Sequence, residues 1–178
     1  MPENIDRALE EQTLRQYGLI GRGGNMGNSL HAIDYGQLPQ RAREIIQLIV
    51  RGGPFPYPDV DNTRFQNEFG DLPAHSDYRE FTVPIPNPNR TPRNPGPEIR
   101  GPRRIIARSS GVLFFTACHY ERVPRGGKTM EQRIELTEQI DPEWRNGFYV
   151  ITGMTIDLRN AIRDSLKNMP VRTRTRPG

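Results

Sequence analysis

The chain has 178 residues, a formal net charge of +4 and an isoelectric point of about 9.6. Only 34% of the residues are hydrophobic, which is enough for one domain with appendages or for two very small domains. The basic balance favours a polyanionic partner without requiring one. A single cysteine, Cys118, excludes an intrachain disulfide, and no stretch approaches the roughly 20 apolar residues that span a bilayer.

The N-terminal part is polar and rich in glycine. Residues 4–16 predict a short helix capped by Asn4, and their acidic character is unlike that of a signal peptide. The stretch "GRGGNMGNS" (21–29) lacks the Gly-Lys-Ser/Thr ending of a phosphate-binding loop, so it is interpreted as a flexible linker. Residues 1–36 are therefore assigned to an N-terminal extension.

The stretch "LPQRAREIIQLIVRGG" (38–53) carries the strongest helix signal in the chain. Pro39 suits the first turn of a helix, and the glycine pair at 52–53 ends it. The apolar residues between them recur with a period of 3.6 and predict one buried face: Ala42, Ile45, Ile46 and Ile49.

Strand patterns follow a segment that is dense in Pro, Asp and Asn and predicts loop and turn (54–73). The stretch "YREFTVPI" (78–85) alternates, so that Phe81 and Val83 face one way and Glu80 and Thr82 the other. A proline-rich excursion (87–102) comes next.

Three short runs then predict further strands, "RRIIARSS" (103–110), "GVLFFTA" (111–117) and "HYERV" (119–123). The pattern predicts an α+β fold in which one N-terminal helix packs on a small antiparallel sheet within residues 37–124.

The C-terminal part, residues 125–178, is assigned to an extension. It contains a candidate strand, "GFYVITGM" (147–154), a candidate helix, "IDLRNAIRDSLKNM" (156–169), and a basic tail. Three roles are compatible with this segment: completing the sheet, mediating dimerisation, or forming a delivery or immunity interface.

The expected sheet carries a carboxylate (Glu80), two arginines (Arg100 and Arg104) and a histidine (His119). Such a set can cleave RNA without a metal or other cofactor. A carboxylate takes the proton of the ribose 2′-hydroxyl, arginines stabilise the charge on phosphorus, and imidazolium protonates the leaving oxygen. Because the 2′-hydroxyl is the nucleophile, DNA is excluded as a substrate. Taken singly, each of these residues is more often a solvated or structural group.

A resemblance to a known family favours a functional role for these residues over a structural one. The segments "GPFPYPDVDNTRFQN", "REFTV", "RGPRRII" and "CHYERV" occur in the order seen in the microbial guanyl-specific ribonucleases, the family of barnase and its smaller secreted relatives. The resemblance covers roughly residues 37–124. Several short motifs in the right order are much more specific than any one of them.

The resemblance implies a role for each matching residue. It makes Glu80 the general base, His119 the general acid, and Arg100 with Arg104 the phosphate-binding pair. Tyr120 resembles the tyrosine that contacts the phosphate. The residues that resemble the guanine-binding loop are Phe65, Gln66 and Asn67. Arg103, between the two phosphate ligands, is expected to point outward.

This chain departs from the family pattern at three positions. The family has Arg and then Glu after "FQN", and that Glu binds the guanine edge, whereas this chain has Glu68 and then Phe69. Either Glu68 replaces the missing carboxylate or base specificity is relaxed. Cys118 stands where an acidic residue usually precedes the histidine.

The sequence therefore predicts a metal-independent endoribonuclease that forms 2′,3′-cyclic phosphates, acting as a toxin or effector. The expected partners are RNA and an acidic, barstar-like inhibitor or immunity protein, and no membrane. The expected setting is that of a secreted or delivered effector acting in a target cytoplasm, with no recognisable signal peptide in the sequence. The missing leader fits a toxin tip cut from or delivered by a larger secretion machine, and it fits equally well a domain excised from a longer chain. The alternative is a catalytically reduced RNA-binding or protein-interaction module on the same fold. A purely structural basic domain would require the motif order to be a coincidence.

Overall fold

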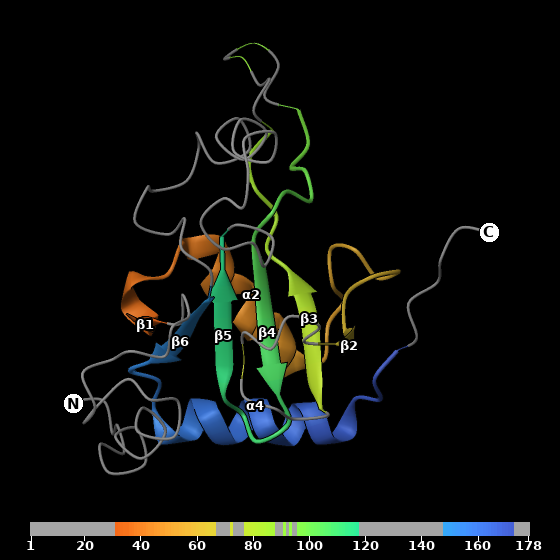
Figure 1. Cartoon of the computed structure of the whole chain (residues 1–178). Coiled ribbons are helices and arrows are strands. Elements are labelled where there is room, and N and C mark those ends of the chain that lie inside the picture. The colour runs from red at the N-terminus through yellow and green to blue at the C-terminus, as the bar shows by residue number, and fades with distance from the viewer. Residues whose placement is uncertain are drawn as a thin grey trace.

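A computed structural model describes residues 31–66, 72, 77–87, 91, 93, 96–117 and 148–172. These residues form one sheet of six strands and two α-helices (Figure 1). In chain order the elements are β1 (His31–Asp34), the 3-10 turn η1 (Tyr35–Gln37), α2 (Gln40–Arg51), β2 (Thr63–Phe65), β3 (Tyr78–Thr82), β4 (Arg104–Arg108), β5 (Leu113–Thr116), β6 (Phe148–Thr152) and α4 (Ile156–Asn168).

The strand order is β1-β6-β5-β4-β3-β2, and every pair is antiparallel except β1 with β6. This arrangement confirms the predicted α+β fold class. To the single helix and small sheet predicted within residues 37–124 it adds two unpredicted outer strands, β1 and β2, together with the strand β6 and helix α4 that were predicted in the C-terminal part. No helix of the described residues is long and apolar enough to cross a membrane.

Helix α2 forms where its apolar period predicted it. Ala42, Ile45, Ile46 and Ile49 are all fully buried. The helix ends because Gly52 adopts a left-handed conformation with φ of 80°, which a residue with a side chain rarely adopts.

The two faces of the sheet differ in their covering. Both α2 and α4 pack on one face, where their apolar residues join Phe81, Ile105 and Phe115 in the main core. Residues one position along each strand point to the opposite face and form a second, smaller cluster. That cluster contains Leu72, Tyr78, Ile106, Val112, Phe114, Phe148 and Val150.

The C-terminal part joins the same sheet. β6 pairs with β5 on one side and with β1 on the other, so the predicted strand is confirmed and it completes the sheet. The predicted helix is α4, which runs crosswise beneath the strands (Figure 1). Thr155 caps it by accepting a hydrogen bond of 3.1 Å from the amide of Leu158.

Two strands appear where the pattern did not predict them. β1 lies inside the segment 1–36 that was assigned to an extension and linker, and β2 lies in the segment predicted as loop and turn. Both are short edge strands. The predicted helix at 4–16, the strand at 119–123 and the tail beyond residue 172 lie outside the described residues.

Candidate active site

The face of the sheet opposite the helices carries the candidate catalytic residues in two rows across the strands. One row contains Thr63, Glu80, Ile106, Phe114 and Val150. The next row contains Thr82, Arg104, Thr116 and Phe148. Glu80 and Arg104 are therefore diagonal neighbours on adjacent strands, a relation that places Cα atoms about 7–8 Å apart.

Glu80 is held in the middle of β3 with only 5% of its surface exposed. The amide of Asn62 donates a hydrogen bond of 2.9 Å to the Glu80 carbonyl, which fixes the backbone. The Thr63 hydroxyl lies 3.5 Å from Glu80 Oε1 but only 2.7 Å from the carbonyl oxygen of Val60. Since that hydroxyl has one hydrogen, the shorter bond to Val60 takes it, and the contact with Glu80 is weak.

Arg104 is an interior arginine with 1% of its surface exposed. Its Nη1 donates to the carbonyl of Gly101 at 2.7 Å and to the carbonyl of Arg103 at 2.8 Å. The guanidinium thus holds the turn that precedes its own strand. Gly101 is needed there, because φ is +59° and a Cβ would lie 2.6 Å from Cγ1 of Ile85.

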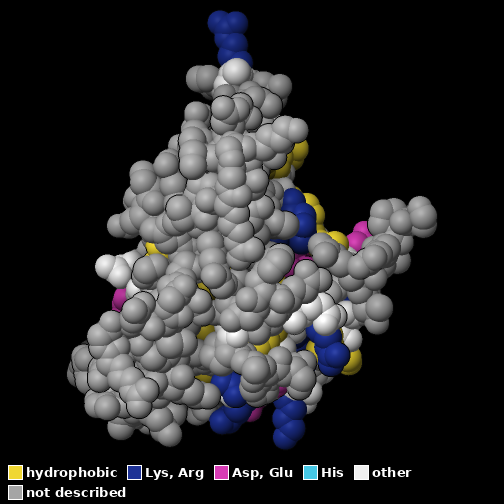
Figure 2. All heavy atoms as spheres, viewed as in Figure 1, with side chains coloured by type: hydrophobic (Ala, Val, Ile, Leu, Met, Phe, Trp, Pro, Cys, Tyr) yellow, Lys and Arg dark blue, Asp and Glu magenta, His cyan; other side chains and the backbone are white. Residues whose placement is uncertain are grey.

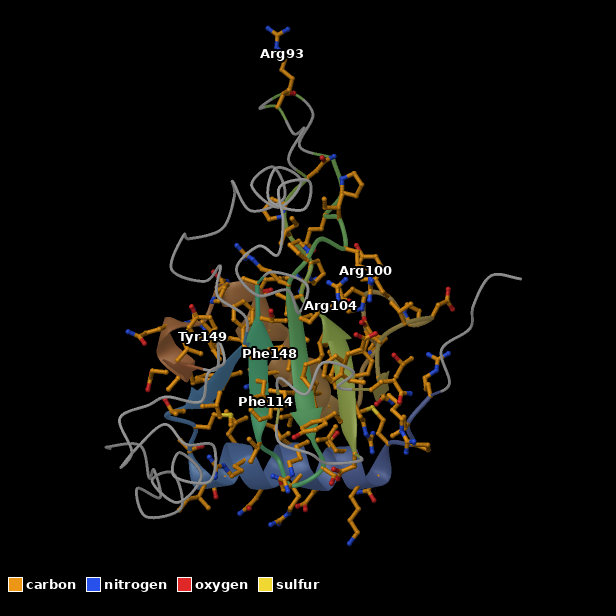
Figure 3. The ribbon with its side chains drawn as sticks, in the orientation of Figure 1. Arg93, Arg100, Arg104, Phe114, Phe148 and Tyr149 are labelled. Carbon is orange, nitrogen blue, oxygen red and sulfur yellow. The ribbon has the colours of Figure 1, made fainter. Side chains whose placement is uncertain are left out.

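That turn brings Arg100 to the same end of the sheet. The Nε of Arg100 donates a hydrogen bond of 3.1 Å to Oγ1 of Thr82, which is the cross-strand partner of Arg104. Figure 3 shows Arg100 and Arg104 next to each other at this end. The space-filling view shows basic side chains beside hydrophobic ones on the same flank (Figure 2). The structure therefore brings Glu80, Arg100 and Arg104 together on one face, and their catalytic roles stay predictions.

Asp61 is a buried carboxylate behind this site that the sequence analysis did not single out. Its Oδ1 accepts the amide of Thr82 at 2.7 Å and its Oδ2 accepts the amide of Tyr57 at 2.9 Å. Burial raises the pKa of Asp61 above its ordinary value, and the bonds from Thr82 and Tyr57 together with the charge of Arg100 oppose that rise. In the sequence, the stretch "PDVD" (58–61) indicates only a turn and gives no sign that Asp61 is buried.

The outward orientation expected for Arg103 is wrong. Arg103 is only 9% exposed, and burial lowers the pKa of its guanidinium. The reason is its position in the alternation. Ile105 and Ala107 face the helices, so Arg103, two residues earlier, points to the same covered side.

Phe65 lies at the end of β2 and is half-buried. Its ring packs on Tyr78 with centroids 6.4 Å apart and on Phe148 with centroids 6.1 Å apart, which fixes the ring at the end of β2. Gln66 is exposed. The remaining predicted site residues lie outside the described residues: Asn67, Glu68, His119 and Tyr120.

Comparison with known proteins identifies the class. A family model described as ribonuclease matches residues 21–126, which is more than half of the chain. Guanyl-specific ribonuclease St from Saccharopolyspora erythraea is 40% identical over 86 residues, covering 47% of this chain and 75% of that protein. Guanyl-specific ribonuclease Sa3 from Kitasatospora aureofaciens is 43% identical over 89 residues, covering 48% of this chain and 56% of that protein.

A solved structure of ribonuclease Sa2 with guanosine-2′-cyclophosphate is 24% identical and has a TM-score of 0.45, covering 68% of this chain and 95% of that one. The family model and the curated relatives show that the chain belongs to the ribonuclease family. Within it, the chain falls among the microbial guanyl-specific ribonucleases and is an endoribonuclease. The match to the family model ends at residue 126, before β6 and α4.

Proposed function

We propose that this endoribonuclease cleaves single-stranded RNA by metal-independent transesterification at the face that carries Glu80, Arg100 and Arg104. The observation that supports this most strongly is the register of β3 and β4. It puts a carboxylate and a guanidinium on one face as diagonal neighbours, and the Thr82 bond holds a second guanidinium beside them.

Each group has one task in the proposed reaction. The Glu80 carboxylate takes the proton of the 2′-hydroxyl, whose oxygen then forms a bond to the adjacent phosphorus. Arg100 and Arg104 stabilise the negative charge of the phosphorane. The bond between phosphorus and the 5′-oxygen breaks, and His119 gives that oxygen a proton while Tyr120 contacts the phosphate. The products are a 2′,3′-cyclic phosphate and a 5′-hydroxyl.

No group of three or more His, Cys, Asp or Glu side chains within the described ranges could hold a metal ion. The proposed chemistry uses only proton transfer and fixed positive charge.

The base preference follows from the loop after β2. The relatives named above are guanyl-specific, and Phe65, Gln66 and Asn67 keep the pattern of the guanine-binding loop. Phe69, however, stands where the family has the glutamate that binds the guanine edge. We propose cleavage after guanine with weakened discrimination, because a site that lacks one hydrogen-bonding partner rejects the other bases less strongly.

The biological setting we propose is a toxin or effector that acts in a target cytoplasm. Intracellular RNA cleavage harms the producing cell, so an acidic inhibitor or immunity protein is the expected partner. A net charge of +4 and the paired arginines at the site favour such a partner, since complementary charge speeds association. Co-purification of an acidic protein that blocks cleavage would test this partner.

Digestion of a mixed-sequence RNA oligonucleotide in EDTA, read by mass spectrometry, tests the proposed reaction. Wild type should yield fragments ending in 2′,3′-cyclic phosphate. Glu80→Gln should lower the rate about 10²- to 10⁴-fold, the range for loss of a general base. His119→Ala should lower it comparably.

Glu98→Gln is the matched control, because Glu98 is half-exposed and its carboxylate pairs with Arg41 of α2 at 3.1 Å. Its rate should equal that of wild type. Intact RNA from folded wild-type protein would contradict the proposed reaction and would leave an RNA-binding or protein-interaction module.

A further inference from the structure

The segment that follows α4 runs along the outer edge of β2. We call residues 169–172 the C-terminal brace. The amide of Arg172 donates a hydrogen bond of 2.9 Å to the carbonyl of Asn62, and Arg172 pairs with Thr63 in a parallel bridge. Figure 1 shows this end of the chain rising beside β2. β2 thus has hydrogen-bonding partners on both sides, β3 on one and the brace on the other.

Arg79 ties the brace to β3, the strand next to β2. It is 8% exposed and lies in β3 directly before Glu80, on the face that the helices cover. Its Nη2 donates to the carbonyl of Leu166 at 2.7 Å, and its Nη1 donates to the carbonyl of Met169. These carbonyls belong to the end of α4, where helix carbonyls lack partners within the helix and favour a positive charge.

Asn62 connects Arg79 to the brace. Its side-chain oxygen accepts from Nη1 of Arg79 at 3.1 Å, and its side-chain nitrogen donates to the carbonyl of Pro170 at 2.9 Å. Its backbone amide bonds Glu80 and its backbone carbonyl bonds Arg172. Asn62 has φ of 61°, a left-handed conformation that asparagine tolerates better than most residues.

β2 needs such support because it is a three-residue strand at the edge of the sheet. A short edge strand opens easily, since few hydrogen bonds hold it. Yet Thr63 faces Glu80 across the ladder, and Phe65 leads into the loop that resembles the guanine-binding loop. Both the general base and the base-recognition loop therefore depend on the position of β2.

We propose that the C-terminal brace is a positioning device, in which Arg79, Asn62 and the backbone of Arg172 hold β2 against Glu80 and aim the base-recognition loop. The brace lies beyond residue 126, where the match to the family model ends. This inference rests on the proposed function, because it assigns the brace a task in that reaction.

A matched pair of substitutions at Arg172 isolates the central hydrogen bond. Arg172→Pro removes the amide hydrogen that bonds Asn62, whereas Arg172→Ala keeps it. Both remove the side chain, whose Nη1 bonds the carbonyl of Pro58, so that loss cancels in the comparison. Residue 172 is exposed, so neither change disturbs the core.

We expect Arg172→Pro to lower kcat/KM for RNA about three- to tenfold relative to Arg172→Ala. The ratio of cleavage after guanine to cleavage after other bases should fall as well. The amide of Asn62, which bonds Glu80, should exchange its hydrogen faster in Arg172→Pro. A brace with only a structural role would change the melting temperature and leave kcat/KM and the base ratio unchanged at a temperature where both variants are folded.

Asn62→Gly provides a second test at the other end of the network. Glycine keeps the left-handed backbone and removes both side-chain bonds. Asn62→Asp keeps an acceptor for Arg79 and loses the donor to Pro170, so its kcat/KM should lie between those of Asn62→Gly and wild type.

The outcomes separate the two proposals. Active wild type with equal kcat/KM and base ratio in the two Arg172 variants would overturn the positioning role and leave the proposed reaction intact. Folded wild type that leaves RNA uncut would overturn the proposed reaction and, with it, the task assigned to the brace. In that case, faster exchange at Asn62 in Arg172→Pro would show a brace that only stabilises the sheet edge.

Discussion

Phe81 and Glu80 are neighbours on β3 and point to opposite faces of the sheet. Phe81 is fully buried, and its ring lies 5.0 Å from that of Phe55 beneath the helices. Glu80, on the other face, shares its surroundings with Thr82 and Arg104, which are also buried. Burying charged groups destabilises a fold unless they find partners. The large apolar core on the helix-covered face therefore offsets the cost of burying Glu80 and Arg104 on the other face.

The largest effect we expect is on stability, at Phe81. Phe81→Ala should lower the free energy of unfolding by about 3–5 kcal/mol, because it leaves a cavity in the main core. Since the side chain points away from the catalytic face, kcat should stay close to wild type wherever the variant is folded. Urea denaturation and an RNA cleavage assay at low temperature measure the two quantities. A loss of kcat in folded protein as large as that of Glu80→Gln would break the distinction between the faces.

Arg100 should give the opposite result. Arg100→Gln should lower kcat about 10²- to 10³-fold, the range for loss of one donor to a developing oxyanion. Its half-buried position predicts little change in the free energy of unfolding. Arg93→Gln is the matched control, since Arg93 is exposed at the far end of the proline-rich excursion (Figure 3). Equal rates for the two variants would remove Arg100 from the site.

A smaller effect is expected at Thr82, which positions Arg100 without touching the substrate. Thr82→Val keeps the shape and removes both the acceptor for Nε of Arg100 and the side-chain hydrogen bond to Asp61, so kcat/KM should fall about tenfold. Thr82→Ser keeps the hydroxyl and should restore most of the activity. If Ser and Val behaved alike in steady-state kinetics, the hydrogen bond would have no part in catalysis.

The smallest effect is a pH dependence of stability at Asp61, whose carboxylate accepts a hydrogen bond from the amide of Thr82 in β3. Because burial raises the pKa of Asp61, the folded state holds this proton more tightly than the unfolded state does. As pH rises from the ordinary value of 3.8 through the folded pKa, the free energy of unfolding should therefore fall relative to that of Asp61→Asn. Denaturation curves across that interval measure the difference. A rise instead would mean that the bonds from Thr82 and Tyr57 outweigh burial.

The elements with local signals could be predicted from the sequence. In α2, the 3.6-residue period of the apolar residues indicates the buried face, and the glycine pair indicates the end of the helix. In β3, the alternation of apolar and polar residues indicates the two faces of the strand. For the same reason Glu80 could be placed on the face opposite Phe81. Arg100 and Arg104 could be paired only through a resemblance. The turn that joins them depends on Gly101 and its close approach to Ile85, a contact that the local pattern does not show.

The elements with distant partners could not be predicted. β1 has four residues and its partner β6 lies more than 100 residues further along the chain. β2 has only three residues, too few to show an alternating strand pattern, and the Pro, Asp and Asn residues around it indicate a turn. Nothing in "YREFTV" indicates that the end of α4 lies against Arg79. The orientation of Arg103 was predicted wrongly, because a shift of one residue in the strand alternation moves a side chain from the exposed side of the sheet to the side that the helices cover.

The parallel pairing of β1 with β6 also bears on how the chain is made. A ribosome synthesises β1 before β6, so β1 has no partner until more than 100 further residues have been translated. Contacts between such distant residues form slowly, because a long loop must close first. The sheet that carries Glu80 is therefore completed only after β6 has been synthesised, well after the strands β3 and β4 that hold Glu80 and Arg104.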